Sequence, residues 1–222
     1  MFKNLQKYKH NSGVTMVELI VVIAIVAILS GMMFFDYGKF KSSTSLQNLA
    51  DDIALSVRKA QMYAVGARGV NGSDFDKGYG VHFSRNTENT FKGSPKSFVL
   101  FVDININANS EYGYDYPIDI SACGTPSSLN ECLEVLSVTG ADYISDVKIT
   151  KTNGGTEQLD GNNKVLDIVY TRPDTAPTIC YRPDINSGCV EGSQVIITVA
   201  NDANPTVTKT VTIYNNGQIS VL

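Results

Sequence analysis

The sequence is poor in histidine, and this scarcity narrows the enzyme classes to which the chain could belong. Only two histidines occur in 222 residues. His10 lies in a short basic segment at the N-terminus, and His82 lies in the alternating stretch KGYGVHF, which is typical of a β-strand. Gly78 and Gly80 do not form a phosphate-binding fingerprint, and no Walker-type motif follows a predicted strand. No convincing Ser/His/Asp arrangement occurs either, so the sequence does not predict an enzyme.

Basic residues are absent from a long stretch in the middle of the chain. Between Ser97 and Val147 there is no lysine or arginine, whereas the whole chain has 18 basic and 22 acidic residues and a formal charge of −4. A nucleic-acid-binding protein usually carries a basic surface, so the net charge does not indicate a nucleic-acid partner. The acidic residues of this stretch are Asp103, Glu111, Asp115, Asp119, Glu131, Glu134, Asp142 and Asp146.

Strongly polar side chains are also nearly absent from Val14 to Phe35, where Glu18 is the single exception. A helix over this range would be about 33 Å long, close to the roughly 30 Å of a bilayer's hydrocarbon core. We therefore predict that residues 14–35 form a helix that spans the plasma (inner) membrane. The preceding segment, residues 1–13, contains lysines and no acidic residue, which favours a cytoplasmic N-terminus and an extracytoplasmic head formed by residues 36–222.

Glu18 needs a compensating partner, because a carboxylate in a membrane helix costs about 2.5–3.5 kcal/mol near the bilayer centre and less near its edge. One candidate partner is an amine. Ser12 and Gly13 separate the basic segment from the apolar run, and cutting after Gly13 would create an α-amino group at Val14. Stacked helices could then place the Val14 amine of one subunit beside Glu18 of the next. The alternative is that Glu18 complements the positive end of its own helix.

The run Gly13-Val14-Thr15-Met16-Val17-Glu18-Leu19-Ile20, followed by aliphatic residues, resembles the processing motif of type IV pilins and type II secretion pseudopilins. The resemblance implies that a prepilin peptidase cuts between Gly13 and Val14, that the new amine of Val14 is methylated, and that Glu18 guides assembly. It also implies other pilin-like subunits, a platform membrane protein and an assembly ATPase as partners, and a pilus or pseudopilus filament as the final location. The chain departs from the family in having Val14 where phenylalanine is usual. It also lacks a proline in the apolar run, which leaves Gly31 and Gly38 as candidate bending points.

The head is predicted to be an α+β domain in which one helix packs on an antiparallel sheet. Apolar residues recur every three or four positions between Leu46 and Ala64, which predicts an amphipathic helix that continues the stem and ends near Gly66. The polar run at residues 42–45 is a candidate weak point in this helix. Asn216-Gly217 predicts a two-residue hairpin turn. The predicted strands are 79–84, 97–103, 143–150, 165–170, 195–200, 206–214 and 219–222.

Four segments make the head similar to the H-type minor pseudopilins and related minor pilins. They are the helical segment LADDIALSVRKAQMYAV, the strand KGYGVHF, the stretch FVLFVDININ and the terminal VTIYNNGQISVL. This resemblance implies a pilin-like head and the role of a minor subunit in the filament.

The four cysteines, Cys123, Cys132, Cys180 and Cys189, all lie in the predicted extracytoplasmic head. The members of each neighbouring pair are close in sequence, so two local disulfides are the simplest of the three possible connectivities. Disulfides fit an oxidising compartment, and each would stabilise the head by roughly 2–3 kcal/mol in the chain-entropy model. A structural zinc site is the alternative, but such sites usually have a shorter spacing between cysteines.

The acidic stretch also contains a candidate calcium site. Asp103, Asn105, Asn107 and Glu111 place side-chain oxygens at mostly alternate positions, which resembles the start of a calcium-binding loop. The glycine and the final bidentate acid of a standard loop are missing. The sequence therefore leaves two interpretations open, a calcium site and a turn in which Asn and Asp side chains bond their own backbone.

The sequence leaves three functions open. The first is a structural subunit, a minor pilin or pseudopilin of a type IV pilus or a type II secretion system. The second is a ligand-binding module at a filament tip, an adhesin or a DNA-uptake minor pilin, in which residues 104–142 engage the ligand. Tyr112, Tyr114 and Tyr116 either form that contact or cover their own domain. The third is a signal-anchored enzyme.

Overall fold

The computed structural model describes residues 13–66, 68–70, 75, 77–85, 93–104, 113–114, 123–124, 126, 130–161, 164–184 and 187–222, with the backbone alone for 33–37. The chain divides into two compact units, Met1–Lys41 and Ser42–Leu222, which we describe separately. We call Ser42–Leu222 the head unit.

Helix α1 (Met16–Val65) continues through the polar run at residues 42–45, so the candidate weak point is not a break in the helix. Two serines of this run are bonded to the strand region: Asn204 Nδ2 donates to Ser42 Oγ over 2.9 Å, and Ser45 Oγ donates to Asp142 Oδ2. Hydroxyls engaged in this way do not compete for the helix backbone. One face of the following helix is buried, as its periodicity predicts. The buried residues of that face are Leu46, Leu49, Ala50, Ile53, Val57, Ala60 and Ala64.

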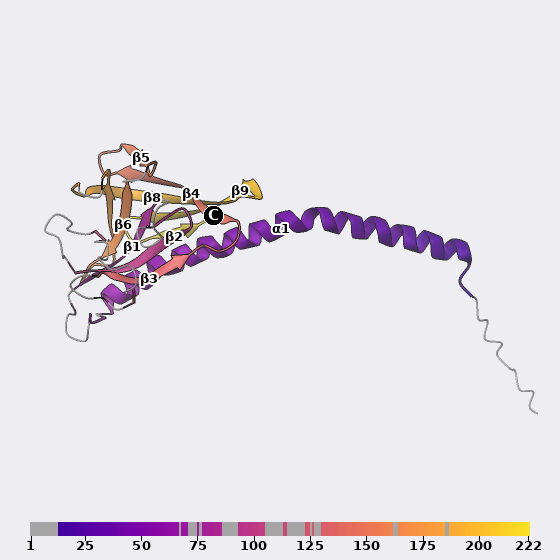
Figure 1. Ribbon diagram of the computed structural model, residues 1–222, viewed down its shortest axis with the longest axis horizontal. Helices are drawn as coiled ribbons and strands as arrows, with labels where there is room; N and C mark the ends of the chain where they lie inside the picture. The colour runs from indigo at the N-terminus through magenta and orange to yellow at the C-terminus, as the bar shows by residue number, and fades with distance from the viewer. Residues whose placement is uncertain are drawn as a thin grey trace, which may run out of the picture. The chain divides into compact units, whose positions relative to one another are not determined.

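The described strands of the head unit form one antiparallel sheet (Figure 1). Its hydrogen-bonded order is β10-β9-β8-β7-β6-β1-β2-β3, and β4 pairs with both β8 and β5. Strand β8 connects β4 and β5 to the other strands of the sheet, because its residues 190–192 pair with β7 and its residues 192–201 pair with β4. The predicted α+β class is confirmed. The bounds are β1 Gly78–Ser84, β2 Ser97–Asp103, β3 Cys132–Ser137, β4 Asp142–Lys151, β5 Thr156–Gln158, β6 Val165–Tyr170, β7 Thr178–Arg182, β8 Val190–Asn201, β9 Asn204–Tyr214 and β10 Ile219–Val221.

Seven of these strands lie at or near their predicted positions, whereas β3, β5 and β7 are absent from the prediction. Strands β3 and β7 each contain a cysteine and lie beside segments rich in glycine, proline or asparagine, and these residues usually mark turns rather than strands. Strand β5 has three residues, too few for its side-chain alternation to be recognised.

Two glycines end elements close to the predicted places. The Gly66 amide donates to the Met62 carbonyl over 2.8 Å, directly after the end of α1. In the β9–β10 hairpin, the Gly217 amide donates to the Tyr214 carbonyl and the Tyr214 amide donates to the Gln218 carbonyl, both over 3.0 Å. This pattern gives a three-residue loop rather than the predicted two-residue turn. Gly217 has φ +84°, which is the left-handed position that such a loop requires.

The central strands are buried on both faces. Tyr79, Val81 and Phe83 of β1 belong to the main core, which also contains the apolar face of α1. His82 points to the opposite face, because successive side chains of a strand alternate. On that opposite face lies a smaller apolar cluster drawn from β2, β3, β6 and the segment at residue 114. Its buried members are Val99, Phe101, Tyr114, Cys132 and Val169.

Candidate functional site

The N-terminal end of α1 begins with a capped turn. The Thr15 hydroxyl accepts a hydrogen bond from the Glu18 amide over 3.3 Å, and the Thr15 carbonyl accepts one from the Leu19 amide over 3.1 Å. Thr15 and Glu18 have the spacing of a capping box, which places an acidic residue in the first helical turn. Gly13 and Val14 precede the helix and are exposed. The peptide bond between them is therefore accessible to a protease.

The first part of α1 carries an apolar surface. Between Val14 and Met32, the large apolar side chains that face solvent are 51–81% exposed. A surface of this size and continuity marks a contact with lipid or with other proteins. Among the described residues, no helix is long and apolar enough to be identified as a membrane span. The assignment of residues 14–35 as a membrane helix stays a prediction.

Glu18 lies within this apolar surface. Its side chain is exposed, and its carboxylate makes no ion pair with any residue that the structure describes. The three predicted processing and assembly residues, Gly13, Val14 and Glu18, are therefore gathered in one short exposed segment. Glu18 also lies in the first turn of α1, where an acidic side chain complements the positive end of the helix, so its helix-end interpretation and its assembly interpretation are compatible.

This segment has a counterpart among known protein families. Residues 8–34 match the prokaryotic N-terminal methylation motif. The methylation motif supports a type IV pilin-like substrate of prepilin peptidase, which implies a membrane-anchored N-terminal helix and assembly with other pilin subunits. It indicates a structural subunit rather than an enzyme. The match lies outside the head unit, so the closer resemblance to H-type minor pseudopilins is not confirmed. No curated protein and no solved structure gives a significant match to the chain.

The candidate calcium site cannot be assembled from the described residues. Asn105, Asn107 and Glu111 lie outside them. Asp103 is described: it is the last residue of β2, and only 4% of it is exposed. In the described part of the chain, no group of three acidic, histidine or cysteine residues could hold a metal ion. Calcium binding therefore remains a prediction that the described residues do not test.

The head unit contains two disulfides, Cys123–Cys132 and Cys180–Cys189. They are the two local pairs that the sequence spacing favoured. Each joins a strand to a neighbouring loop: Cys132 begins β3 and Cys180 lies in β7. The side chains of Cys132 and Cys180 both lie on the sheet face opposite α1, which also carries the smaller apolar cluster. The disulfides therefore tie loops to the part of the head unit that α1 does not cover.

Removing the second disulfide is expected to destabilise the head unit without unfolding it. In a Cys180→Ser/Cys189→Ser variant, we expect the free energy of unfolding to fall by about 2–3 kcal/mol, because the unfolded chain regains the entropy of an open loop. This change corresponds to a decrease in melting temperature of roughly 4–12 °C for a chain of this size. Differential scanning calorimetry measures it, with a Cys123→Ser/Cys132→Ser variant for comparison. Melting temperatures equal to that of the unchanged protein would contradict a stabilising role.

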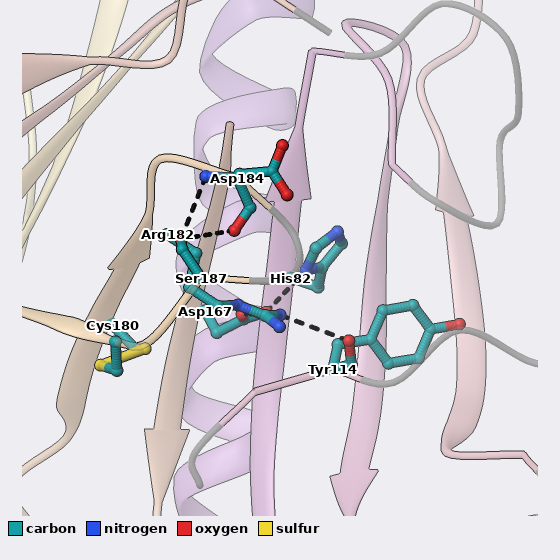
Figure 2. A network of polar contacts seen from close by, with 8 residues as sticks. His82, Tyr114, Asp167, Cys180, Arg182, Asp184 and Ser187 are labelled. Carbon is teal, nitrogen blue, oxygen red and sulfur yellow. Dashed lines mark hydrogen bonds and ion pairs between the residues drawn. A yellow bond between two sulfur atoms is a disulfide. The ribbon is translucent and has the colours of Figure 1, made fainter. Parts of the chain in front are cut away.

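A network of three buried polar side chains crosses β1, β6 and β7 (Figure 2). Asp167 is at its centre: His82 Nδ1 lies 2.6 Å from Asp167 Oδ1, and Arg182 Nη2 donates to Asp167 Oδ2 over 2.7 Å. Arg182 Nη2 also donates to the Tyr114 carbonyl over 3.3 Å. An ionised carboxylate only accepts hydrogen bonds, so His82 carries its proton on Nδ1. The network thus links three strands to the segment that covers them.

The pKa of Asp167 lies below its ordinary value. Burial by itself raises this pKa, but the charges and hydrogen bonds of Arg182 and His82 more than offset the effect. Gly113 lies against the guanidinium, since a Cβ at this position would be 2.9 Å from Arg182 Cζ. A substrate cannot reach side chains that are covered in this way. The arrangement therefore stabilises the sheet and its covering segment, and the His–Asp pair does not form an accessible catalytic site.

The sequence interpretation missed this network. His82 was identified only as a strand residue, and Asp167 and Arg182 were not selected at all. Their contact depends on the pairing of β1 with β6 and of β6 with β7, which places His82 directly opposite Asp167. Tyr114 is fully buried against the same face, so this tyrosine covers its own domain. Tyr112 and Tyr116 lie outside the described residues.

Proposed function

We propose that the chain is a minor pilin or pseudopilin of a type IV pilus or a type II secretion pseudopilus. The observation that carries this proposal is the methylation motif over residues 8–34, on a helix whose apolar side chains are exposed. Prepilin peptidase cuts between Gly13 and Val14, and the new amine of Val14 is methylated. Before assembly, the helix anchors the chain in the inner membrane with the head outside.

In the assembled filament, Glu18 pairs with the Val14 amine of a neighbouring subunit. The exposed carboxylate without an ionic partner in the described chain supports this pairing. Packed apolar helices exclude water, so the attraction between the two charges is weakly screened. A platform membrane protein and an assembly ATPase supply the energy of polymerisation. The tip-module alternative rests on residues 104–142, many of which lie outside the described residues.

Filament fractionation tests this function. Filaments sheared from cells that produce the full chain are expected to contain it, as shown by tryptic peptides of the head unit. In cells without prepilin peptidase, the chain is expected to remain in the membrane fraction at its uncut length. A chain that stays in the membrane fraction of peptidase-containing cells that assemble filaments would contradict the proposal.

A further inference from the structure

Strand β3 ends the strand order of the described sheet, and part of its outer side carries backbone groups that pair with no described residue. The Val138 amide donates to the Lys96 carbonyl across the pairing of β3 with β2, over 2.8 Å. Because adjacent residues of an antiparallel strand direct these groups to opposite sides, Leu136 directs its groups toward β2, while Val135 and Ser137 direct theirs away. Neither Val135 nor Ser137 has a backbone hydrogen-bond partner among the described residues.

A groove of about 450 Å³ lies beside this edge, between β3 and α1. Asn48, Leu49 and Asp52 line it from the helix, and residues 134–139 line it from β3 and the segment that follows. Figure 1 shows β3 at the edge of the sheet next to α1. A bound strand in this position would pair its backbone with Val135 and Ser137. Its alternate side chains would enter the groove, which is the geometry of strand addition.

The charge of the groove indicates which strand it would accept. Its lining contains Asp52, Glu134 and Asp142 and no lysine or arginine. Two of these carboxylates have partners within the chain. Glu134 Oε2 lies 2.5 Å from Lys59 Nζ, and Asp142 Oδ1 accepts a hydrogen bond from Asn201 Nδ2 over 2.5 Å. Asp52 is exposed, and its carboxylate makes no hydrogen bond or ion pair with any described residue. The groove therefore presents a negative charge that favours a basic side chain.

The same charge disfavours a second copy of this chain as the occupant. Loss of residues 1–13 removes three of the 18 basic residues, and 15 basic against 22 acidic residues leave a mature charge of −7. Two copies would thus approach each other with like charges. A different filament subunit with an extended, lysine- or arginine-bearing segment has the complementary charge.

We propose that the groove between α1 and β3 binds an extended, lysine- or arginine-bearing segment of a different pilin-type subunit, which adds a strand to β3. This inference rests on the proposed function, since it requires the chain to lie among such subunits. The contact would give the subunit a fixed neighbour in addition to the contacts of its N-terminal helix.

Photo-crosslinking of the full chain in cells that assemble filaments tests the inference. A benzophenone amino acid replaces Thr139, which is exposed and lines the groove, or the exposed Thr156 on β5, another edge strand of the described sheet, as a matched control. From position 139 we expect a covalent adduct with another subunit that carries the methylation motif, attached at a segment containing lysine or arginine. From position 156 we expect no adduct with that segment.

Three variants separate strand addition from chance proximity. Ser137→Pro removes an amide that faces the open edge and leaves the pairing with β2 intact, whereas Ser137→Ala retains the amide. We expect the adduct yield to fall about fivefold or more with Ser137→Pro and to remain unchanged with Ser137→Ala. With Asp52→Lys we expect it to fall about threefold or more, because the groove loses its negative charge. Ser137→Ala and Asp52→Lys both leave the backbone of β3 unaltered. Resistance to protease verifies that each variant is folded. If Ser137→Pro fails to fold, Asp52→Lys alone decides.

Each remaining outcome contradicts the inference. An adduct with a second copy of this chain would contradict the proposed partner. An adduct that persists in both Ser137→Pro and Asp52→Lys would mean that charge and strand pairing do not hold the partner. If the chain is present in sheared filaments but gives no adduct from position 139, the groove is not a subunit contact although the proposed function stands. If the chain is absent from filaments and gives no adduct, both the proposed function and the inference fail.

Discussion

A Glu18→Gln variant is expected to be depleted from filaments by about tenfold or more, although it still enters the membrane and is still cut. Glutamine keeps the size, the helix preference and the capping spacing of Glu18, but it removes the negative charge. If the carboxylate pairs with the Val14 amine of a neighbour in an apolar surrounding, its loss leaves that amine without a partner. Breaking a buried ion pair typically costs about 3–5 kcal/mol, whereas tenfold depletion requires only about 1.4 kcal/mol. Quantitative immunoblotting of sheared filaments, normalised to the processed chain in membranes, measures the effect.

A Thr15→Ala variant is the matched control for this experiment. It removes the hydroxyl that accepts from the Glu18 amide, and it leaves the Glu18 carboxylate in place. The lost cap costs about 1 kcal/mol of helix stability at a site that neighbouring helices also support, so incorporation should change little. Normal incorporation of Glu18→Gln together with reduced incorporation of Thr15→Ala would show that Glu18 serves its own helix end, and the intersubunit pairing would be wrong.

An Asp167→Asn variant is expected to lose about 3–5 kcal/mol of unfolding free energy, because it breaks a buried ion pair in the head unit. Asparagine fills the same space but leaves Arg182 as a buried charge without its carboxylate. The corresponding decrease in melting temperature is roughly 6–20 °C for a chain of this size. Chemical denaturation of the full chain in detergent, followed by circular dichroism, measures the change.

The control for Asp167 is Asp160→Asn. Asp160 forms an ion pair with Lys164, but its side chain is 68% exposed. Solvent screens exposed ion pairs, which therefore contribute little to stability, so this variant should unfold almost as the unchanged chain does. Equal losses for the two variants would show that the buried network has no special role in stability.

The effect of Asp167→Asn should also depend on pH in a defined direction. The pKa of Asp167 is lower in the folded chain than its ordinary value of 3.8. The folded state therefore gains stability from this carboxylate above that ordinary value, and the gain is lost as the pH falls through the lower folded pKa. We expect the difference between Asp167→Asn and the unchanged chain to be full near pH 7 and to narrow below about pH 4. A difference that stays constant over this range would contradict the ionised state of Asp167.

Local patterns predicted much of the fold. The three- and four-residue spacing between Leu46 and Ala64 identified the buried face of α1, and alternating residues identified seven strands. The order of the strands was not predicted, because β1 pairs with β6 although His82 and Asp167, which face each other, are 85 positions apart in the sequence. The hydrophobic pattern of either strand also fits several neighbours. Asn216-Gly217 indicated the hairpin, but the loop length depends on the register of β9 with β10.

The candidate sites formed by residues close in sequence were predicted, whereas those that depend on strand pairing were not. Gly13, Val14 and Glu18 are near neighbours in sequence, so one motif was enough to select them. The disulfides are also local and followed from spacing. The network of His82, Asp167 and Arg182 requires three strands to be placed side by side, and none of its residues is unusual for a strand end or a strand interior. The groove beside β3 is not predicted either, because the predicted strands do not include residues 132–137.

The mature N-terminus is the most direct test of the account. Mass spectrometry of the chain isolated from filaments is expected to identify an N-terminal peptide that begins at Val14 and carries a methyl group on its amine. A functional chain that begins at Met1, or one cut after Leu29, would contradict the account, because no amine would then exist at Val14 to pair with Glu18.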